Sequence, residues 1–187
     1  MARKHGVTAN TYKKFIVDSG AVYLNYGESD ESLFGATRGG TSFVIETEYR
    51  DMPVDGAKGP VKGSRRITAV NAILTANFVE LSSALLSRIL PGSAVADYGS
   101  PKTHDEITRA LAIALTDYAT NVALVGEVTG NSTDAAEFII DNALVDGNFE
   151  LGLTDGEEPV LAAQFKGHFD PASMDAEPWT IRFPEIA

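Results

Sequence analysis

The sequence predicts a mainly β protein of the α+β class: a β-sandwich or barrel with one short flanking helix and a long projecting hairpin loop. Runs of β-branched and aromatic residues, separated by turns that contain glycine, dominate the 187-residue chain, and this pattern is typical of antiparallel sheets. Only residues 81–92 combine helical spacing with a clear stop signal. The length suits a single domain over residues 1–187.

The N-terminal part predicts a hairpin and then a loop. The runs KKFIV and AVYLNY flank the polar turn Asp18-Ser19-Gly20, which favours a β-hairpin. A basic N-terminal arm precedes it, over about residues 1–13. Residues 28–42 are polar and rich in glycine, so we expect a loop there.

Two long strands with a basic loop between them come next. The first, residues 43–52, alternates with a period of two, which predicts one apolar face and one wet face that carries Glu46 and Glu48. A strand as long as residues 67–80 spans roughly 46 Å at about 3.3 Å per residue, more than the core of a small domain requires. Part of this hairpin is therefore expected to project or to meet a partner. The second strand places its apolar side chains on one face: Val70, Ala72, Leu74, Ala76 and Phe78.

The middle of the chain contains the predicted helix and an ambiguous segment. In residues 81–92, leucine and isoleucine repeat at helical spacing, and Pro91-Gly92 ends the helix. A capping box at residues 103–106 and the alanine content of residues 106–114 favour a second helix. Apolar residues in the same stretch also alternate as in a strand.

The last third of the chain predicts short strands and an extended tail. The tail begins near Asp170, bears prolines and contains the only tryptophan. Asp146-Gly147 and Asp155-Gly156 are turn signals between strands. The predicted strands are NVALVGEVTG, EFIIDNALV, NFELGLTD and VLAAQFKGHF.

No residue pattern for catalysis or metal binding stands out. The chain has no cysteine, which excludes disulfides and thiolate chemistry. None of the three histidines has an i,i+4 partner for zinc. His168 and Asp170 alternate and could share a ligand, although a surface pair is the plainer interpretation. No G-x-S-x-G nucleophile elbow is present. We therefore expect no enzyme activity, no catalytic residues, no metal and no cofactor.

Charge and hydropathy limit the partners. The formal net charge of −11 argues against general binding to nucleic acid or to an anionic membrane, because like charges repel. No apolar run reaches the roughly 18 to 20 residues that cross a bilayer, and the basic start lacks the apolar stretch of a secretory signal. We expect a soluble protein of cytoplasmic origin with no membrane partner.

The loop over residues 53–66 is the most basic part of this acidic chain. It does not fit a phosphate-binding Walker loop, because its glycine and lysine spacing is wrong and a strand follows where a helix should begin. The glycines of residues 35–40 do not fit the dinucleotide-binding pattern either, because a strand follows them where a helix should begin. The basic loop contains one acid, Asp55, and four cations: Lys58, Lys62, Arg65 and Arg66.

Two interpretations of these cations remain. They could be gatekeepers on a solvated hairpin tip. They could also make the tip complementary to the acidic body of another copy of the chain. A tip that contacts a remote patch is a heterologous contact, which propagates into rings or filaments. Because the strands that carry the tip are unusually long, we favour assembly.

Several stretches resemble a known family. Residues 33–81, from LFGATRGG to ANFVEL, resemble the core of the major tail (tail tube) proteins of long-tailed bacteriophages. NVALVGEVTG, NALVDGNFELGL and FKGHFDPASMDAEPWTIRFP resemble later parts of the same family, in the same order. The resemblance covers most of the chain and is weakest over residues 93–116.

The resemblance implies a structural virion protein. Its β-sandwich would self-assemble into six-membered rings that stack into a hollow tube, with the inner sheets merged into one barrel around the lumen. The tube would enclose a tape-measure protein, meet tail terminator and tail tip proteins, and conduct DNA without specific binding. The location would be the virion tail, assembled in the host cytoplasm.

The resemblance also assigns roles to residues of this chain. The basic loop occupies the place of the family's inter-ring loop, so its charged residues are implied inter-ring contacts: Asp55, Lys58, Lys62, Arg65 and Arg66. Glu46 and Glu48 become candidates for an anionic lumen face along which DNA slides. Strand is favoured over helix for residues 106–114, since tertiary context often overrides propensity.

The alternative function belongs to a different class. A non-enzymatic β-sandwich binding module, such as a capsid decoration or carbohydrate-binding domain, would have the same composition. The aromatic content of 9% and the single tryptophan weaken the case for a sugar-binding platform.

Overall fold

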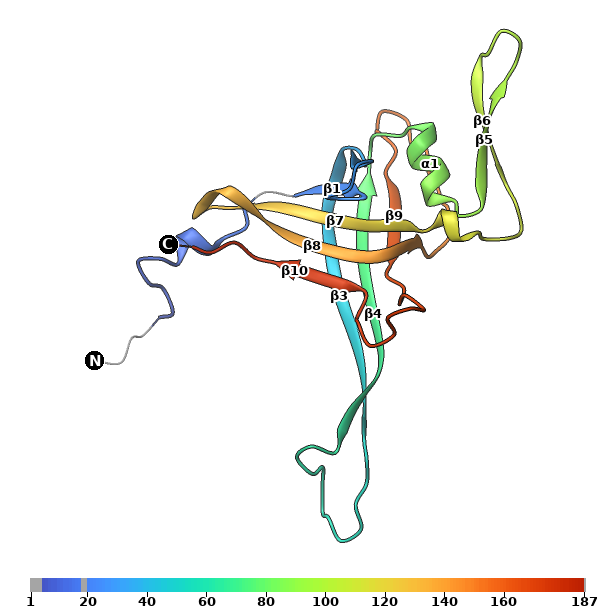
Figure 1. Ribbon diagram of the computed structural model, residues 1–187. Coiled ribbons are helices and arrows are strands. Elements are labelled where there is room, and N and C mark those ends of the chain that lie inside the picture. The colour runs from blue at the N-terminus through green and yellow to red at the C-terminus, as the bar shows by residue number, and fades with distance from the viewer. Residues whose placement is uncertain (1–4, 18–19, 187) are drawn as a thin grey trace.

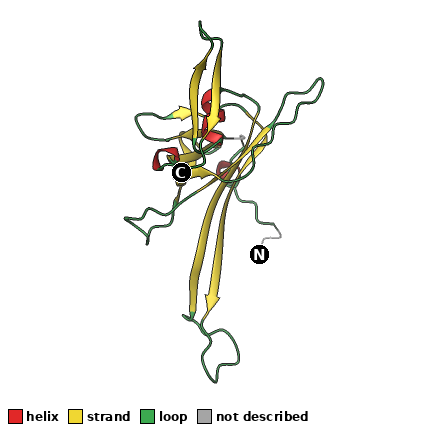
Figure 2. Cartoon of the chain, turned by 90° about the vertical axis from the view of Figure 1, so that its right-hand side faces the viewer, coloured by secondary structure: helices red, strands yellow, loops and turns green. Residues whose placement is uncertain are grey.

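A computed structural model of the chain describes residues 5–17 and 20–186. Within them, antiparallel strands form two layers that run crosswise, and one α-helix covers an end of the core (Figure 1). The mainly β class predicted from the sequence is confirmed. Two hairpins, within residues 37–78 and 93–109, project from the body at opposite ends, and Figure 2 shows them from a second direction.

The element bounds are as follows. The strands are β1 (Ala21–Leu24), β2 (Ser32–Leu33), β3 (Thr37–Asp51), β4 (Arg65–Phe78), β5 (Ser93–Tyr98), β6 (His104–Arg109), β7 (Ala119–Val128), β8 (Asn131–Val145), β9 (Leu161–Lys166) and β10 (Trp179–Arg182). The helix α1 spans Ser83–Ile89, and 3-10 turns cover Tyr12–Lys14 and Leu115–Asp117.

Strand β8 joins the two layers. One layer has the order β2-β1-β7-β8 with β10 on the far side of β8, and the other has the order β8-β9-β4-β3. β8 pairs with β10 over residues 137–140 and with β9 through Leu144 and Val145. Asn142 lies between these two pairings with φ of 48°, a left-handed conformation that asparagine tolerates better than most residues. The change of partner therefore coincides with a local turn of the strand.

The core lies between the layers and under α1. The predicted apolar face of β4 is buried from Val70 to Phe78. The ring of Phe34 packs against Phe78 and Phe165, with centroids 5.5 and 5.2 Å apart. The helix begins where Ser82 Oγ accepts a hydrogen bond from Leu85 N at 3.1 Å, as a serine N-cap does, and its inward residues are buried. The predicted helix is confirmed.

The β3–β4 hairpin extends well beyond this core. Its strands pair from Thr37 opposite Phe78 to Asp51 opposite Arg65. Residues 48–51 and 65–68 are exposed on both faces, so the far part of the hairpin has no packing partner within the chain. We call residues 48–68 the arm. The predicted projection is confirmed, but the loop itself is shorter than residues 53–66, because Arg65 and Arg66 belong to β4.

The predicted N-terminal hairpin is wrong. Residues Tyr12–Lys14 form a 3-10 turn, and Ile16 makes one bridge to Val128 of β7. β1 pairs instead with β7 and with β2, because distant apolar strands offer it more buried contact than its sequence neighbour does. Residues 18 and 19 of the predicted turn lie outside the described residues. The predicted loop over residues 28–42 is also too long, since it contains β2 and the start of β3.

Two further expectations in the second half need correction. NFELGLTD forms no strand, because residues 148–155 are mostly exposed and glycines at 147, 152 and 156 interrupt the stretch. Residues 106–114 form no helix: β6 runs to Arg109 against β5, which agrees with the resemblance, and residues 110–114 then continue without strand pairing. β9 ends at Lys166, earlier than predicted.

Candidate assembly surfaces

The stem of the arm is stabilised by one arginine. Arg65 Nε lies 3.3 Å from Asp51 Oδ1, directly across the two strands. The guanidinium also stacks over the ring of Tyr49, 4.6 Å from its centroid, a cation–π contact that stabilises exposed pairs modestly. Arg65 was expected as an inter-ring contact, and the structure gives it a role inside the arm.

The tip of the arm, residues 52–64, closes through its own backbone. Met52 N donates to Ser64 O at 3.1 Å, and Ser64 Oγ donates to Val61 O at 2.7 Å. Ser64 is buried while the rest of the tip is exposed. The strand ends are therefore held together while the side chains of the tip face solvent.

Three of the predicted contact cations, at or near the tip, remain available for contact with another chain. Lys58, Lys62 and Arg66 are exposed, and none has an ion pair within residues 5–17 and 20–186. Asp55 lies among them, also exposed. The structure thus brings the predicted charged residues together at one end of the molecule, with a basic excess.

The opposite end of the β3–β4 hairpin is acidic. Leu161 pairs with Phe78 at that end, so the preceding loop over residues 146–160 lies there. Arg38 Nη1 contacts Glu158 Oε2 at 2.8 Å. A backbone hydrogen bond and the Arg38 guanidinium lower the pKa of Glu158, which keeps it ionised. The loop carries five acids: Asp146, which pairs with Lys166, and Glu150, Asp155, Glu157 and Glu158. Sequence reasoning missed this acidic end, although the run DGEEP was its signal.

The wet face predicted for β3 is present. Side chains from Thr41 to Thr47 alternate between half-buried and exposed, and Glu46 and Glu48 lie on the exposed side. In register, Glu46 faces Asn71 and Glu48 faces Ala69 on β4. Gln164 of β9 extends the same polar face. The layer β9-β4-β3 therefore presents a largely polar surface outward, which also includes Val44 and its cross-strand partner Ile73.

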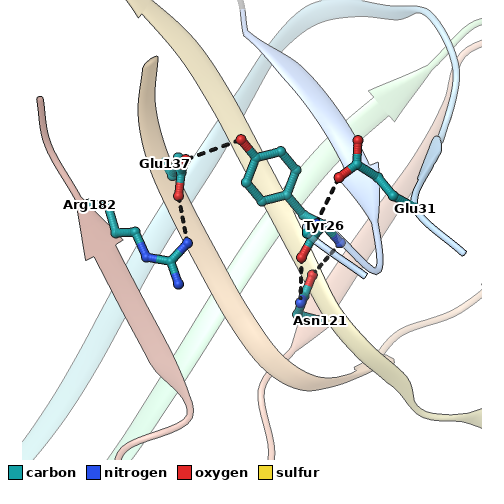
Figure 3. A network of polar contacts seen from close by, with 6 residues as sticks. Tyr26, Glu31, Asn121, Glu137 and Arg182 are labelled. Carbon is teal, nitrogen blue, oxygen red and sulfur yellow. Dashed lines mark hydrogen bonds and ion pairs between the residues drawn. The ribbon is translucent and has the colours of Figure 1, made fainter. Parts of the chain in front are cut away.

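A polar network fixes the opposite layer (Figure 3). Tyr26 Oη donates to Glu137 Oε1 at 3.1 Å, and Arg182 Nη1 donates to Glu137 Oε2 at 2.9 Å. Tyr26 N donates to Asn121 Oδ1 at 2.7 Å, and Asn121 Nδ2 donates back to Tyr26 O at 3.1 Å. Burial, followed by the hydrogen bond to Glu137, raises the pKa of Tyr26. The network ties the segment after β1 to β7, β8 and β10.

The structure places His168 and Asp170, for which a surface pair was the plainer interpretation, in separate local contacts. His168 packs edge-on against Tyr118, with ring centroids 5.1 Å apart, and its Nδ1 lies 3.1 Å from Asn142 O. Asp170 accepts a hydrogen bond from Ala172 N at 2.8 Å. Within the described ranges, no cluster of three potential metal ligands occurs. Nor does any helix in those ranges have the length and hydrophobicity needed to cross a bilayer.

The accessible surface is large for the mass. The chain exposes 12804 Å² at 19.9 kDa, whereas a compact monomer of this mass exposes about 8,700 Å². The excess is several times the roughly 800 Å² that one partner buries in a standard interface. The shape therefore suits a chain that buries more than one surface against other chains.

Comparison with known proteins gives structural neighbours only. No family model and no curated protein sequence matches the chain. The tail of an empty GTA particle with C6 symmetry is 9% identical with a TM-score of 0.44, over 89% of this chain and 96% of that chain. The six-fold symmetrised baseplate of the anti-feeding prophage is 13% identical with a TM-score of 0.39, over 89% of each chain. An Hcp protein is 14% identical with a TM-score of 0.32, over 84% of this chain and 79% of that chain.

The identities and TM-scores are too low to assign the chain to a family.

Proposed function

We propose that the chain is a tail tube protein. Copies form six-membered rings, the rings stack into a hollow tube, and the tube encloses a tape-measure protein and later conducts DNA. Terminator and tip proteins would close its two ends. The protein acts as a structural component of a virion tail, assembled in the host cytoplasm, and performs no catalysis.

The observation that carries this proposal is the charge polarity along the β3–β4 hairpin. A basic tip projects from one end, and the acidic loop over residues 146–160 lies at the other. Such a molecule is complementary to a second copy placed above or below it, and because the contact is heterologous it propagates. Lys58, Lys62 and Arg66 would contact the acidic end of the next ring, with Asp55 beside them.

The outward polar face of β9-β4-β3 fits the wall of a channel. Glu46 and Glu48 would face the lumen, where their charge repels the DNA backbone and lets it slide without sticking. The outward residues of β4 between Ala69 and Asn77 include no aromatic ring on which bases could stack, although Ile73 is apolar. This placement also leaves the polar network of Figure 3 on the outer wall.

Electron microscopy of the purified protein tests the proposal. We expect rings with six-fold symmetry and tubes built from them as the protein concentration rises. The alternative, a β-sandwich binding module, predicts monomers or small oligomers at every concentration. Particles that stay monomeric at high concentration, and decorate virions singly, would overturn the tail tube proposal.

A further inference from the structure

Residues 110–115 form an exposed apolar strap. The sequence ALAIAL is apolar at all six positions, and every one of them is exposed. Leu111 is fully exposed, Ile113 is 51% exposed and Leu115 is 90% exposed. So long an exposed apolar run is unfavourable in a soluble protein unless something covers it.

The hydrogen bonds that hold the strap lie at its two ends. Ala110 N donates to Gly92 O at 2.9 Å, and Ala114 N donates to Asp117 Oδ2 at 2.6 Å. Between them, the backbone groups of residues 111–113 form no hydrogen bond within residues 5–17 and 20–186. An extended apolar segment with free backbone groups is suited to bind along another chain.

A second apolar surface lies at the other end of β7. Ile16 bridges to Val128, and Thr129 N donates to Phe15 O at 2.9 Å. These contacts, with the pairing of β10 along β8, bring the two terminal segments to the same end of the β7–β8 hairpin (Figure 1). We call their exposed apolar residues the terminal cluster: Tyr12, Phe15, Ile16, Val17, Ile181 and Phe183.

One copy cannot cover its own strap with its terminal cluster. The strap leads towards the first residue of β7, and Ile16 of the cluster bridges to the last. β7 has ten residues, which span roughly 30 Å at about 3.3 Å each. The strap and the N-terminal part of the cluster therefore lie at opposite ends of β7, too far apart to touch within one copy.

We propose that the apolar strap of one copy docks on the terminal cluster of a second copy, as the lateral contact between neighbours. Both surfaces are apolar, both are exposed and they lie at opposite ends of one strand, so a repeated contact of this kind is heterologous. Heterologous contacts form a ring when the rotation between successive copies closes. The excess accessible surface of the chain is large enough for such a second interface besides stacking. The inference rests on the proposed ring assembly and names the residues that close it.

The direction of this contact differs from that of the arm. Figure 1 shows β7 and β8 running across the β3–β4 hairpin, so the strap and the terminal cluster lie at the sides of the body while the arm leaves from one end. The strap carries no charge between Arg109 and Asp117. Lateral docking should therefore resist salt, whereas the stacking contact should weaken with it.

The test combines substitution with cross-linking. Leu111→Asp with Leu115→Asp removes the apolar contact, and Val17→Asp with Phe183→Asp removes its partner. Burial of one leucine favours association by about tenfold or more, so each double variant should require at least about a hundredfold higher protein concentration to form rings. The substituted residues are exposed in the free subunit, so circular dichroism and Tm of the free subunit should stay unchanged. Met174→Asp, an exposed apolar residue outside both surfaces, is the control and should assemble normally.

Cross-linking identifies the partner surface. A photoreactive p-benzoylphenylalanine in place of Leu111 should cross-link, in assembled protein only, to residues 12–17 or 181–183 of another copy. Normal ring formation by the Leu111 and Leu115 double variant, or cross-links confined to other segments, would overturn this inference and leave the tail tube proposal standing. Absence of rings from the unaltered protein would overturn both.

Discussion

Asn25 is a buried polar residue on which the segment after β1 depends. Its side-chain Oδ1 accepts a hydrogen bond from Thr120 N at 3.0 Å, and its Nδ2 donates to Asp30 Oδ2 at 2.6 Å. Its backbone has φ of 51°, and its backbone N donates to Asn121 O at 2.9 Å. A buried polar group needs such partners, and asparagine is one of the few residues other than glycine that adopts this backbone conformation readily.

Substitution of Asn25 should separate these two contributions. Asn25→Gly removes the side-chain hydrogen bonds and leaves the Thr120 amide without a partner, which should lower the free energy of unfolding by roughly 1 to 3 kcal/mol. Asn25→Ala should cost about 1 kcal/mol more, because a Cβ is strained at positive φ. Urea unfolding of the free subunit measures both. Equal stability of the two variants would contradict the assigned strain.

Asp141 should make stability depend on pH. Burial raises the pKa of its carboxyl group, and Arg182 opposes the shift only partly. A raised pKa in the folded state means that protonation stabilises the fold, and this stabilisation is lost as pH rises through the folded pKa. Asp141→Asn should therefore raise Tm at pH 7 by a few degrees at most, and the difference from wild type should vanish near pH 3.5. Scans of the free subunit at both pH values test this, and an equal difference at both would refute it.

The arm is an element that the single chain cannot stabilise by packing. Beyond Glu48 it is a two-stranded ribbon with both faces in solvent, and such ribbons are marginal by themselves. The contacts of Arg65 with Asp51 and Tyr49 hold its stem, which leaves Lys58, Lys62 and Arg66 for contact outside the chain. These cations therefore have different roles, which follow from the register that places Arg65 opposite Asp51.

Charge reversal at the tip should shorten tubes. One exposed ion pair contributes only about 0.2 to 1 kcal/mol, but each ring junction repeats it six times in the proposed assembly. Lys58→Glu with Lys62→Glu and Arg66→Glu should therefore give shorter tubes by electron microscopy, with single rings still formed.

The acidic end offers a matched rescue of this variant. Adding Glu150→Lys, Asp155→Lys and Glu157→Lys to the same chain restores opposite charges across the junction and should restore tube length. These acids have no ion pair within the described residues, whereas Glu158 is paired with Arg38. Tubes of normal length from the variant with the reversed tip alone would show that charge plays no part in the stacking contact.

At the scale of the whole molecule, five candidate contact surfaces lie in different places. The charged tip and the acidic loop lie at the two ends of the long hairpin, the strap and the terminal cluster lie at the sides, and the polar layer β9-β4-β3 faces outward from the sandwich. A compact fold with none of these would expose about 8,700 Å², against 12804 Å² here. The assembly, rather than the subunit, is where this surface would be buried.

The polar layer should matter for DNA and not for stacking. Glu46→Gln with Glu48→Gln removes two negative charges from the proposed lumen wall in every copy, so tubes of normal length should form and should bind DNA more strongly than wild-type tubes do. Tube length by microscopy and retention of DNA by purified tubes measure the two effects. Glu106→Gln with Asp175→Asn, two exposed acids outside both the proposed lumen wall and the acidic end, is the control for charge removal elsewhere. Shortened tubes from the Glu46 and Glu48 variant would place these residues in a subunit contact instead.

Local pattern alone determined several parts of this protein. The period-two alternation of β3 and β4, the spacing and stop signal of α1, and the excess length of the β3–β4 hairpin could all be read from the sequence, because each depends on near neighbours in the chain. The basic tip was equally plain, since charge composition needs no partner to be recognised. The role of Arg65 could not be predicted from the sequence, because it depends on which residue lies across the hairpin.

Only the tertiary structure decided which strands pair and what remains uncovered. β1 pairs with β7, about a hundred residues away in sequence, and β8 changes partner at Asn142, because the burial of distant apolar faces outweighs the local turn signals. Residues 110–115 have helical composition, yet the chain enters β7 extended and leaves them in solvent. Local propensity differs by less than about 1 kcal/mol per residue, while burying one large apolar side chain contributes about 1.5 to 3 kcal/mol. Long-range packing therefore sets the pairing.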